Sequence, residues 1–372
     1  MDQMLLLGHA GSRLPWPWSA FASRYLSVLL ILVVLLCCGN VVLLELVSFF
    51  TNVCNASESN LEMKADGGDD RPHKLKEVTP SLGAHFNNHE EFPYRYPINE
   101  PHLCRGGVFI INIIPVALSN FESRRRIRHT WASRATRESI DIRSVFLVGV
   151  TNNTKYQQLI DEESRTYHDI IQVNIIDNYR NLSLKTLTIL HWTTTYCPGA
   201  SWLLKSDDDV FVNPFALRKM FSDNKKAGFL CSINRFLWVC RKDKRCPKKW
   251  AVSSQEYQHN IYPPYCTGAA YAVNSSMVRK LLADANKKHP FVIEDVYFTG
   301  ILALRYMAEY VDIRNRFYFH ASNITEQFWN GEIIFSMFEA NVRNVSYYTL
   351  WSKIVHYYRK QTMLLPLVNA NV

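Results

Sequence analysis

Short apolar runs rich in β-branched residues alternate with helix-forming stretches through the main part of the sequence. The strand-like runs are 108–114 (VFIINII), 144–150 (SVFLVGV), 170–176 (IIQVNII) and 202–205 (WLLK). Between them, residues 121–133 and the stretch from Leu184, which Pro198 and Gly199 end, are expected to be helices. This order predicts an α/β domain with a mostly parallel sheet, whose ligands bind beyond the carboxyl ends of its strands.

Three consecutive carboxylates follow the last of these strands. Asp207, Asp208 and Asp209 repel one another at the end of a buried run, and apolar residues resume at Val210. Clustered carboxylates suit a hard divalent cation such as Mg²⁺ or Mn²⁺, which could neutralise a diphosphate leaving group. A surface turn or helix cap is the alternative, because aspartate is common at both.

A second acidic pair stands in the segment "HPFVIEDVYFTG" (289–300). Glu294 and Asp295 again follow an apolar run. In a cleft shared with the three aspartates, one of the two could act as a general base toward an attacking hydroxyl. They could also simply begin a helix, where acidic side chains meet the positive end of the helix dipole.

Two further segments could contact a ligand. Arg125, Arg126 and Arg128, just before Trp131, could bind phosphate groups through bidentate contacts or form a solvated helix face. The segment "YPPYCTGAAY" (262–271) could stack on a sugar or a base, or form a packed turn tied by a disulfide. Neither the nucleophile-elbow serine motif nor the phosphate-loop motif occurs in the sequence.

The N-terminal region contains a run of nineteen residues without a charge, Leu26–Leu44. Such a run is long enough to cross a bilayer as a helix. Arg13 and Arg24 precede it, so the positive-inside rule places the N-terminus in the cytosol. A cleaved signal peptide is the alternative, although its apolar region would be shorter. We expect a cytoplasmic tail (1–25), a transmembrane signal anchor (26–50), a lumenal stem (51–103) and a lumenal folded domain (104–372).

Sequons and cysteines agree with a lumenal main domain. The candidate N-glycosylation sites beyond the apolar run are Asn55, Asn152, Asn181, Asn274, Asn323 and Asn344. The main domain has six cysteines, which could pair as disulfides in an oxidising compartment. Zinc is an alternative for Cys240 and Cys246, although their spacing is unlike that of a zinc finger. The net charge of +9 suggests an acidic partner, but a nucleic-acid-binding protein fits neither the apolar run nor the sequons.

Six motifs occur in the order found in the β1,3-glycosyltransferase family, which includes β1,3-galactosyltransferases and β1,3-N-acetylglucosaminyltransferases. They are "RRRIRHTW" (124–131), "VFLVG" (145–149), "YHDIIQVNIIDNYRNLSLKT" (167–186), "KSDDDVFVN" (205–213), "YPPYCTGAAY" (262–271) and "EDVYFTG" (294–300). Together they span most of the expected folded domain. The sequence therefore resembles this family.

The resemblance implies a fold and a reaction. The fold would be a GT-A-type, Rossmann-like sheet flanked by helices, behind a membrane anchor and stem in the Golgi. The reaction would be an inverting β1,3-transfer of a hexose from a UDP-sugar to a glycan on a glycoprotein or glycolipid. Galactose is favoured over N-acetylglucosamine as the sugar. Nucleic acid is not expected as a partner, and a homo- or hetero-oligomer stays open.

The resemblance also implies residue roles. Asp209, with Asp207, would bind Mn²⁺ or Mg²⁺, and Asp295 would deprotonate the acceptor hydroxyl. The residues implied on the UDP-sugar side are Arg128, Lys185, Asp207 and Asp208. The residues implied at the acceptor cleft are Tyr265, Gly268 and Glu294.

Three departures from the family pattern stand out. Relatives usually carry a metal-binding histidine well after the "EDV" motif, and residues 335–351 contain none. Glu339, Asn341 or a displaced His320 could take its place. Asn174 stands where an acidic residue is common, and Ala269-Ala270 where glycines are. These departures leave open a second interpretation, a catalytically silent lumenal protein that binds glycans or assists a partner transferase.

Overall fold

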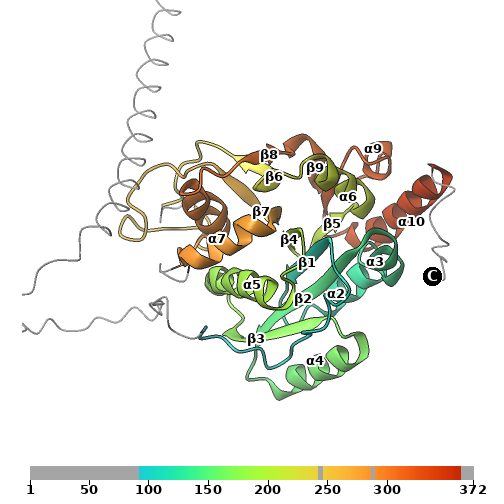
Figure 1. Ribbon diagram of the computed structural model, residues 1–372, viewed down its shortest axis with the longest axis horizontal. Coiled ribbons are helices and arrows are strands. Elements are labelled where there is room, and N and C mark those ends of the chain that lie inside the picture. The colour runs from blue at the N-terminus through green and yellow to red at the C-terminus, as the bar shows by residue number, and fades with distance from the viewer. Residues whose placement is uncertain (1–91, 242–245, 286–289, 362–372) are drawn as a thin grey trace, which may run out of the picture. The chain divides into compact units, whose positions relative to one another are not determined.

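The computed structural model describes residues 92–241, 246–285 and 290–361 (Figure 1). The expected cytoplasmic tail, membrane anchor and most of the stem, together with Asn55, lie outside these residues. Within the described ranges, no helix is both long and apolar enough to cross a membrane. Phe92, Tyr94 and Tyr96 already pack against the core, so the packed domain begins ahead of Cys104.

A seven-stranded sheet with the order β3-β2-β1-β4-β7-β6-β8 forms the centre of this domain. Its strands are β1 (Ile110–Pro115), β2 (Ile142–Val150), β3 (Ile170–Ile176), β4 (Trp202–Ser206), β6 (Phe229–Asn234), β7 (Tyr265–Asn274) and β8 (Tyr310–Asp312). Strand β7 runs antiparallel to both β4 and β6, while the other neighbouring pairs are parallel. The predicted α/β class with a mostly parallel sheet is therefore confirmed.

A smaller sheet with the order β5-β10-β9 continues from the end of β4. It consists of β5 (Val210–Val212), β9 (Phe317–Ala321) and β10 (Phe335–Phe338). Only Asp207, Asp208 and Asp209 separate β4 from β5, so the acidic segment is the first of the links by which the chain passes between the two sheets.

Side chains alternate across the large sheet and build a core on each face. Ile110 and Ile114 of β1 belong to one cluster, and Ile111 and Ile113 belong to the other. The second cluster includes residues of α5 and α7, which lie side by side in Figure 1. The helices are α2 (Phe121–Arg128), α3 (Arg134–Ile140), α4 (Thr154–Tyr167), α5 (Leu182–Tyr196), α6 (Pro214–Asp223), α7 (Ser275–Ala285), α8 (Glu294–Val296), α9 (Glu326–Trp329) and α10 (Arg343–Gln361). Two 3₁₀ turns, η1 (Tyr179–Asn181) and η3 (Arg314–Arg316), and a π-helix, η2 (Tyr297–Leu302), complete the described elements.

The helix predicted over residues 121–133 ends five residues early, and a second helix begins just after the predicted range. Helix α2 ends at Arg128, and α3 begins after Ser133, whose side chain accepts a hydrogen bond from the backbone N–H of Thr136. Serine satisfies the free N–H groups of a first helical turn, so it starts a new helix rather than continuing the old one.

The six cysteines of the domain form three disulfides: Cys104–Cys197, Cys231–Cys266 and Cys240–Cys246. The disulfide interpretation is confirmed, and the zinc alternative for Cys240 and Cys246 is wrong. Cys231–Cys266 joins the neighbouring strands β6 and β7 inside the core. Cys240–Cys246 closes a short loop in the connection between those strands.

Candidate active site

A cavity of about 610 Å³ opens where β4 ends and β7 begins. Asp207 and Asp209 line it from the link between the two sheets. Glu294 and Asp295 line it from α8, and Tyr265 and Gly268 line it from β7. The structure therefore brings the two acidic motifs and the aromatic-glycine segment into one cavity, as the family resemblance implies.

Lys205 connects these motifs, and no role was predicted for it. Its side chain is 1% exposed, and its ammonium group donates hydrogen bonds to Asp207 Oδ1 at 2.6 Å and to the Gly268 carbonyl oxygen at 2.5 Å. Glu294 Oε2 lies 3.8 Å away. A buried charge is stable only when it is paired. The contacts of this lysine therefore keep the end of β4, the start of β7 and α8 together. A lysine inside the apolar strand "WLLKS" is the signal that could have identified it.

The first acidic cluster has raised pKa values where it faces the cavity. Although 39% of the Asp207 side chain is exposed, its surroundings raise its pKa to about 6. Burial is the main cause, and the charges of Asp209 and Glu294 add to it while Lys205 opposes it. Burial, followed by the charge of Asp208, also raises the pKa of Asp209. Carboxylates held together against their repulsion in this way are typical of a site for a cation.

Asp208 points elsewhere. Its Oδ2 accepts a hydrogen bond from Asn120 Nδ2 at 2.9 Å, next to the start of α2, and it is not among the residues that line the cavity. Of the three aspartates, Asp207 and Asp209 are thus the two that a ligand in the cavity can reach.

Asp295 has the properties of a general base. Burial, followed by the charge of Glu294, raises its pKa to about 7. Its two oxygens accept hydrogen bonds from the backbone N–H groups of Gly268 and Val296, each at 2.9 Å. A Cβ atom on residue 268 would lie 2.9 Å from Asp295 Oδ2, so only glycine permits this approach. A carboxylate with a pKa near neutrality can accept a proton at physiological pH.

Glu294 is a packed residue rather than a free base. It is 4% exposed and accepts hydrogen bonds from Thr186 Oγ1 at 2.9 Å and from the Tyr271 hydroxyl. Glu294 and Asp295 also begin α8, so the helix-start interpretation is confirmed as well. Glu294 therefore fixes α8 to α5 and β7, and this leaves Asp295 as the member of the pair that could act as a base.

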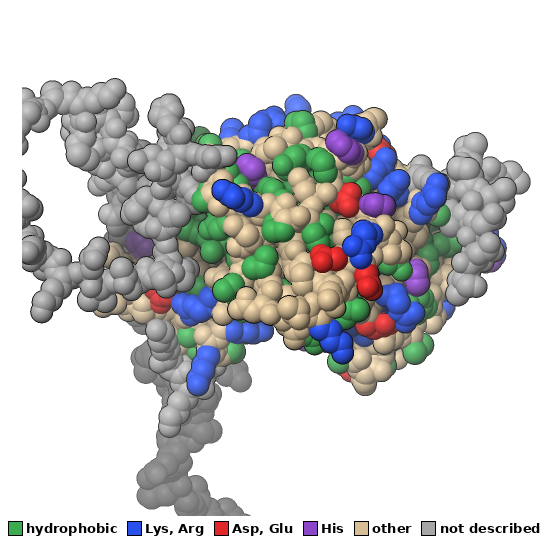
Figure 2. All heavy atoms as spheres, turned by 90° about the horizontal axis from the view of Figure 1, so that it is seen from below, with side chains coloured by type: hydrophobic (Ala, Val, Ile, Leu, Met, Phe, Trp, Pro, Cys, Tyr) green, Lys and Arg blue, Asp and Glu red, His purple; other side chains and the backbone are tan. Residues whose placement is uncertain are grey.

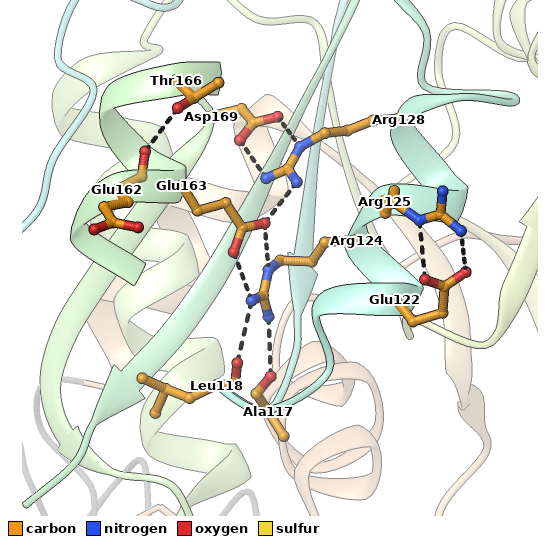
Figure 3. A network of polar contacts seen from close by, with 10 residues as sticks. All are labelled: Ala117, Leu118, Glu122, Arg124, Arg125, Arg128, Glu162, Glu163, Thr166 and Asp169. Carbon is orange, nitrogen blue, oxygen red and sulfur yellow. Dashed lines mark hydrogen bonds and ion pairs between the residues drawn. The ribbon is translucent and has the colours of Figure 1, made fainter. Parts of the chain in front are cut away.

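Arg128 lies apart from the cavity, in the ion-pair network of Figure 3. Its guanidinium donates to both oxygens of Asp169 at 2.8 Å and to Glu163 at 2.5 Å. Glu163 also accepts two hydrogen bonds from the fully buried Arg124. The nucleotide contact implied for Arg128 thus stays a prediction, and what the structure shows is the attachment of α2 to α4 and to the start of β3.

Lys185 lies at the carboxyl ends of β1, β2 and β3, where it is 5% exposed. It pairs with Asp177, and its Nζ lies 3.4 Å from the Val116 carbonyl oxygen. Asp177 also accepts hydrogen bonds from the backbone N–H groups of Leu118 and Gly149. This cluster occupies the edge of the sheet where α/β proteins bind ligands, and the UDP contact of Lys185 stays a prediction.

The basic residues do not form one surface. Arg124 and Arg126 are buried, and Arg125 pairs with the exposed Glu122. On the face shown in Figure 2, lysine and arginine side chains lie in several separate places, some of them beside acidic ones. The net charge therefore does not by itself mark a binding surface there.

Of the three substitutes considered for the missing late histidine, His320 lies at the cavity. It stands in β9 with a left-handed φ of 57°, and it lines the cavity together with Asp207 and Asp209. Glu339 and Asn341 are exposed and are not lining residues. Across the residues that the structure describes, no group of three or more His, Cys, Asp or Glu side chains is close enough to enclose a metal ion.

The candidate glycosylation sites differ in accessibility. Asn152, Asn323 and Asn344 are exposed, while Asn181 and Asn274 are half-buried. The Asn181 Nδ2 donates a hydrogen bond to the Ile176 carbonyl oxygen at 2.9 Å. Ser183 of the same sequon is 2% exposed, and its hydroxyl donates to the Phe291 carbonyl oxygen.

Comparisons with known proteins show the family to which the chain is similar. The galactosyltransferase family model matches residues 122–314. Beta-1,3-galactosyltransferase 2 of Mus musculus is 31% identical over 274 residues, which are 71% of this chain and 64% of the relative. The UDP-GlcNAc:betaGal beta-1,3-N-acetylglucosaminyltransferase 7 of Rattus norvegicus is 31% identical over 207 residues, 54% of this chain and 52% of the relative.

The match to these relatives is partial in length. The chain spans somewhat more than half the length of the curated relatives it matches. The family model begins in α2 and ends after β8, so it includes both acidic motifs and Lys205. The chain belongs to the galactosyltransferase family.

Proposed function

We propose that the protein is an inverting β1,3-glycosyltransferase, which transfers galactose, or alternatively N-acetylglucosamine, from a UDP-sugar to a hydroxyl of a glycan. The observation that carries the proposal is the shared cavity, in which Asp295, with a pKa of about 7, faces the same space as Asp207 and Asp209. The names of the relatives support a β1,3-linkage and both sugars.

Asp295 would take the proton of the acceptor hydroxyl as the oxygen attacks the anomeric carbon of the donor sugar. The bond between that carbon and UDP breaks on the opposite face, so the configuration inverts. Gly268 and Val296 hold the carboxylate of Asp295 through their backbone N–H groups. Burial, followed by the neighbouring charge of Glu294, raises the pKa of Asp295 so that it can accept a proton near neutral pH.

Asp207 and Asp209 would hold Mn²⁺ or Mg²⁺. Both carboxylates line the cavity and have raised pKa values, which suits a divalent cation. Such an ion commonly completes its coordination with water and substrate phosphates, so two protein carboxylates suffice. When bound, it would neutralise charge on the UDP leaving group.

The proposed location is the Golgi membrane, with the catalytic domain in the lumen. The charge-free run Leu26–Leu44 with arginines before it supports a type II anchor. The three disulfides support an oxidising compartment.

Calorimetry of UDP binding to the full-length protein in detergent, with and without Mn²⁺, tests the proposal. We expect binding that requires Mn²⁺ and that Asp209→Asn abolishes. Asp223→Asn is the matched control, because Asp223 is an exposed aspartate paired with Lys219 on α6. Absence of UDP binding in the folded wild-type protein would contradict the proposal and favour the catalytically silent interpretation.

A further inference from the structure

One wall of the cavity carries large apolar side chains that are unusually exposed. Tyr179, Leu237, Trp238 and Trp250 line the cavity and are 43%, 45%, 68% and 45% exposed. They come from η1 and from the connection between β6 and β7. We refer to these four residues, three of which are aromatic, as the aromatic wall. Exposed apolar groups gathered at one place commonly mark a binding surface.

The backbone of the aromatic wall is fixed although its side chains are exposed. Trp238 forms a β-bridge with Ile261, and the N–H of Val239 donates to the Asn260 carbonyl oxygen at 2.8 Å. The Cys240–Cys246 disulfide closes the loop that follows. A surface that is ordered before binding loses little conformational entropy when a ligand arrives.

Trp250 of the aromatic wall is attached to η1. Trp250 Nε1 donates to the Tyr179 hydroxyl at 2.8 Å, and Arg180 pairs with Glu256 at 2.8 Å. The Lys249 ammonium lies over the Trp250 ring at 4.6 Å. Among the described residues, no ring or cation is stacked on Trp238, so its ring is the one best placed to receive a ligand.

A neutral sugar ring fits this wall better than an anionic one. Sugars present an apolar face of C–H groups with hydroxyls at the rim, which suits an aromatic face surrounded by polar groups. The polar side chains of Asn234 and Thr267 line the same cavity. Four carboxylates also line it, of which Asp207 and Asp209 would hold the metal ion and Glu294 is hydrogen-bonded inside the domain. The carboxylate of Asp295 and the ammonium group of Lys249 remain, so the lining offers no excess of positive charge to an acidic glycan.

We propose that the aromatic wall is the binding site for the second sugar of the acceptor, so that the acceptor is a neutral oligosaccharide of at least two residues. The terminal sugar lies at Asp295, and the ring next to it stacks on Trp238. This inference rests on the proposed function, because it takes Asp295 as the place of the accepting hydroxyl.

The test is an NMR titration of acceptors with the full-length protein, saturated with UDP and Mn²⁺, in a detergent without sugar head groups. One probe pair is methyl β-N-acetylglucosaminide and a β-linked disaccharide whose terminal, non-reducing sugar is N-acetylglucosamine. The other is methyl β-galactoside and N-acetyllactosamine. In the pair that binds, we expect the disaccharide to bind about tenfold more tightly than the methyl glycoside.

Trp238→Ala should remove most of this gain and leave the affinity for the methyl glycoside unchanged. Trp238→Phe should keep much of it, because a ring remains. Phe236→Ala is the matched control, since Phe236 is an aromatic of the same segment, 53% exposed, that does not line the cavity. UDP binding with Mn²⁺ should be equal in all variants, which shows that they are folded.

Three results would overturn the inference. They are a Trp238→Ala variant that keeps the full gain, a methyl glycoside that binds as tightly as its disaccharide, and binding of sialylated or sulfated saccharides alone. Failure of the wild-type protein to bind UDP is a separate result, which would contradict the proposed function itself.

Discussion

At the scale of single residues, the site depends on ionisable groups that the fold keeps in surroundings unfavourable to their charge. Lys205 is an ammonium group inside a sheet, and Asp295 is an acid with a pKa of about 7. The carboxylate motifs could be predicted from the sequence because three adjacent aspartates after an apolar strand are conspicuous. The role of Lys205 could not, because its partner Gly268 lies 63 residues further along the chain.

Lys205→Met should destabilise the fold strongly. The change leaves Asp207 and the Gly268 carbonyl oxygen without their donor, and breaking a buried ion pair costs about 3 kcal/mol. Urea denaturation measures the free energy of unfolding. Lys219→Met removes an exposed pair with Asp223 and should change the free energy of unfolding by less than about 1 kcal/mol. Equal effects of the two changes would contradict the role given to Lys205.

The pH dependence of transfer should reflect Asp295. The base must be ionised, so kcat/KM should fall by about tenfold for each pH unit below the pKa of about 7, and a bound divalent cation would move this limb to lower pH. Because the folded pKa lies above the unfolded value, the folded state binds more protons between about pH 4 and 7, so Asp295 lowers stability as pH rises through this window.

Asp295→Asn should abolish transfer while UDP binding persists. Full transfer by this variant would exclude Asp295 as the base.

Glycosylation should follow local accessibility if the domain enters the secretory pathway. Asn152 and Asn323 lie in exposed segments and should carry glycans. Asn181 should remain unmodified, because its amide and the hydroxyl of Ser183 are both hydrogen-bonded to the backbone. Mass spectrometry of protein secreted from eukaryotic cells gives the occupancy of each site. A fully occupied Asn181 would show that the folded contacts do not protect it.

At the scale of elements, the arginine motif attaches helix α2 to its neighbours. Arg124 and Arg128 fasten α2 to Glu163 of α4 and to Asp169 (Figure 3). Strands could be predicted from the sequence because a short run of β-branched residues identifies them locally. The early end of α2 at Arg128 and the pairing of the arginines could not, because no Gly or Pro marks the first and the second depends on long-range partners.

Glu163→Gln should weaken this attachment. The change removes the charge shared by two buried guanidinium groups and should lower the free energy of unfolding by about 3 kcal/mol. Glu122→Gln breaks the exposed pair with Arg125 and serves as the control, with an expected loss below about 1 kcal/mol. Thermal and urea denaturation give both values, and a similar small loss for the two variants would refute the argument.

At the scale of the whole domain, the reversed strand β7 assembles the site. Its direction places its first residues beside the end of β4, where Ser206 pairs with Ala270. The sequence predicted both acidic motifs and the parallel character of the sheet. It did not indicate the reversal, nor that the aromatic residues around Trp238 and Trp250 reach the same cavity, because both depend on how distant segments meet.

The acidic link between β4 and β5 has a mechanical consequence. It is a covalent junction of the two sheets, and the side chains of Asp207 and Asp209 face the cavity. Any ligand that fixes Asp207 and Asp209 therefore immobilises the junction from which both sheets extend. Donor binding should slow hydrogen exchange at amides of β5 and β10, which lie in the smaller sheet, as well as at the end of β4. Occupancy of the cavity would then make the two sheets open as one cooperative unit.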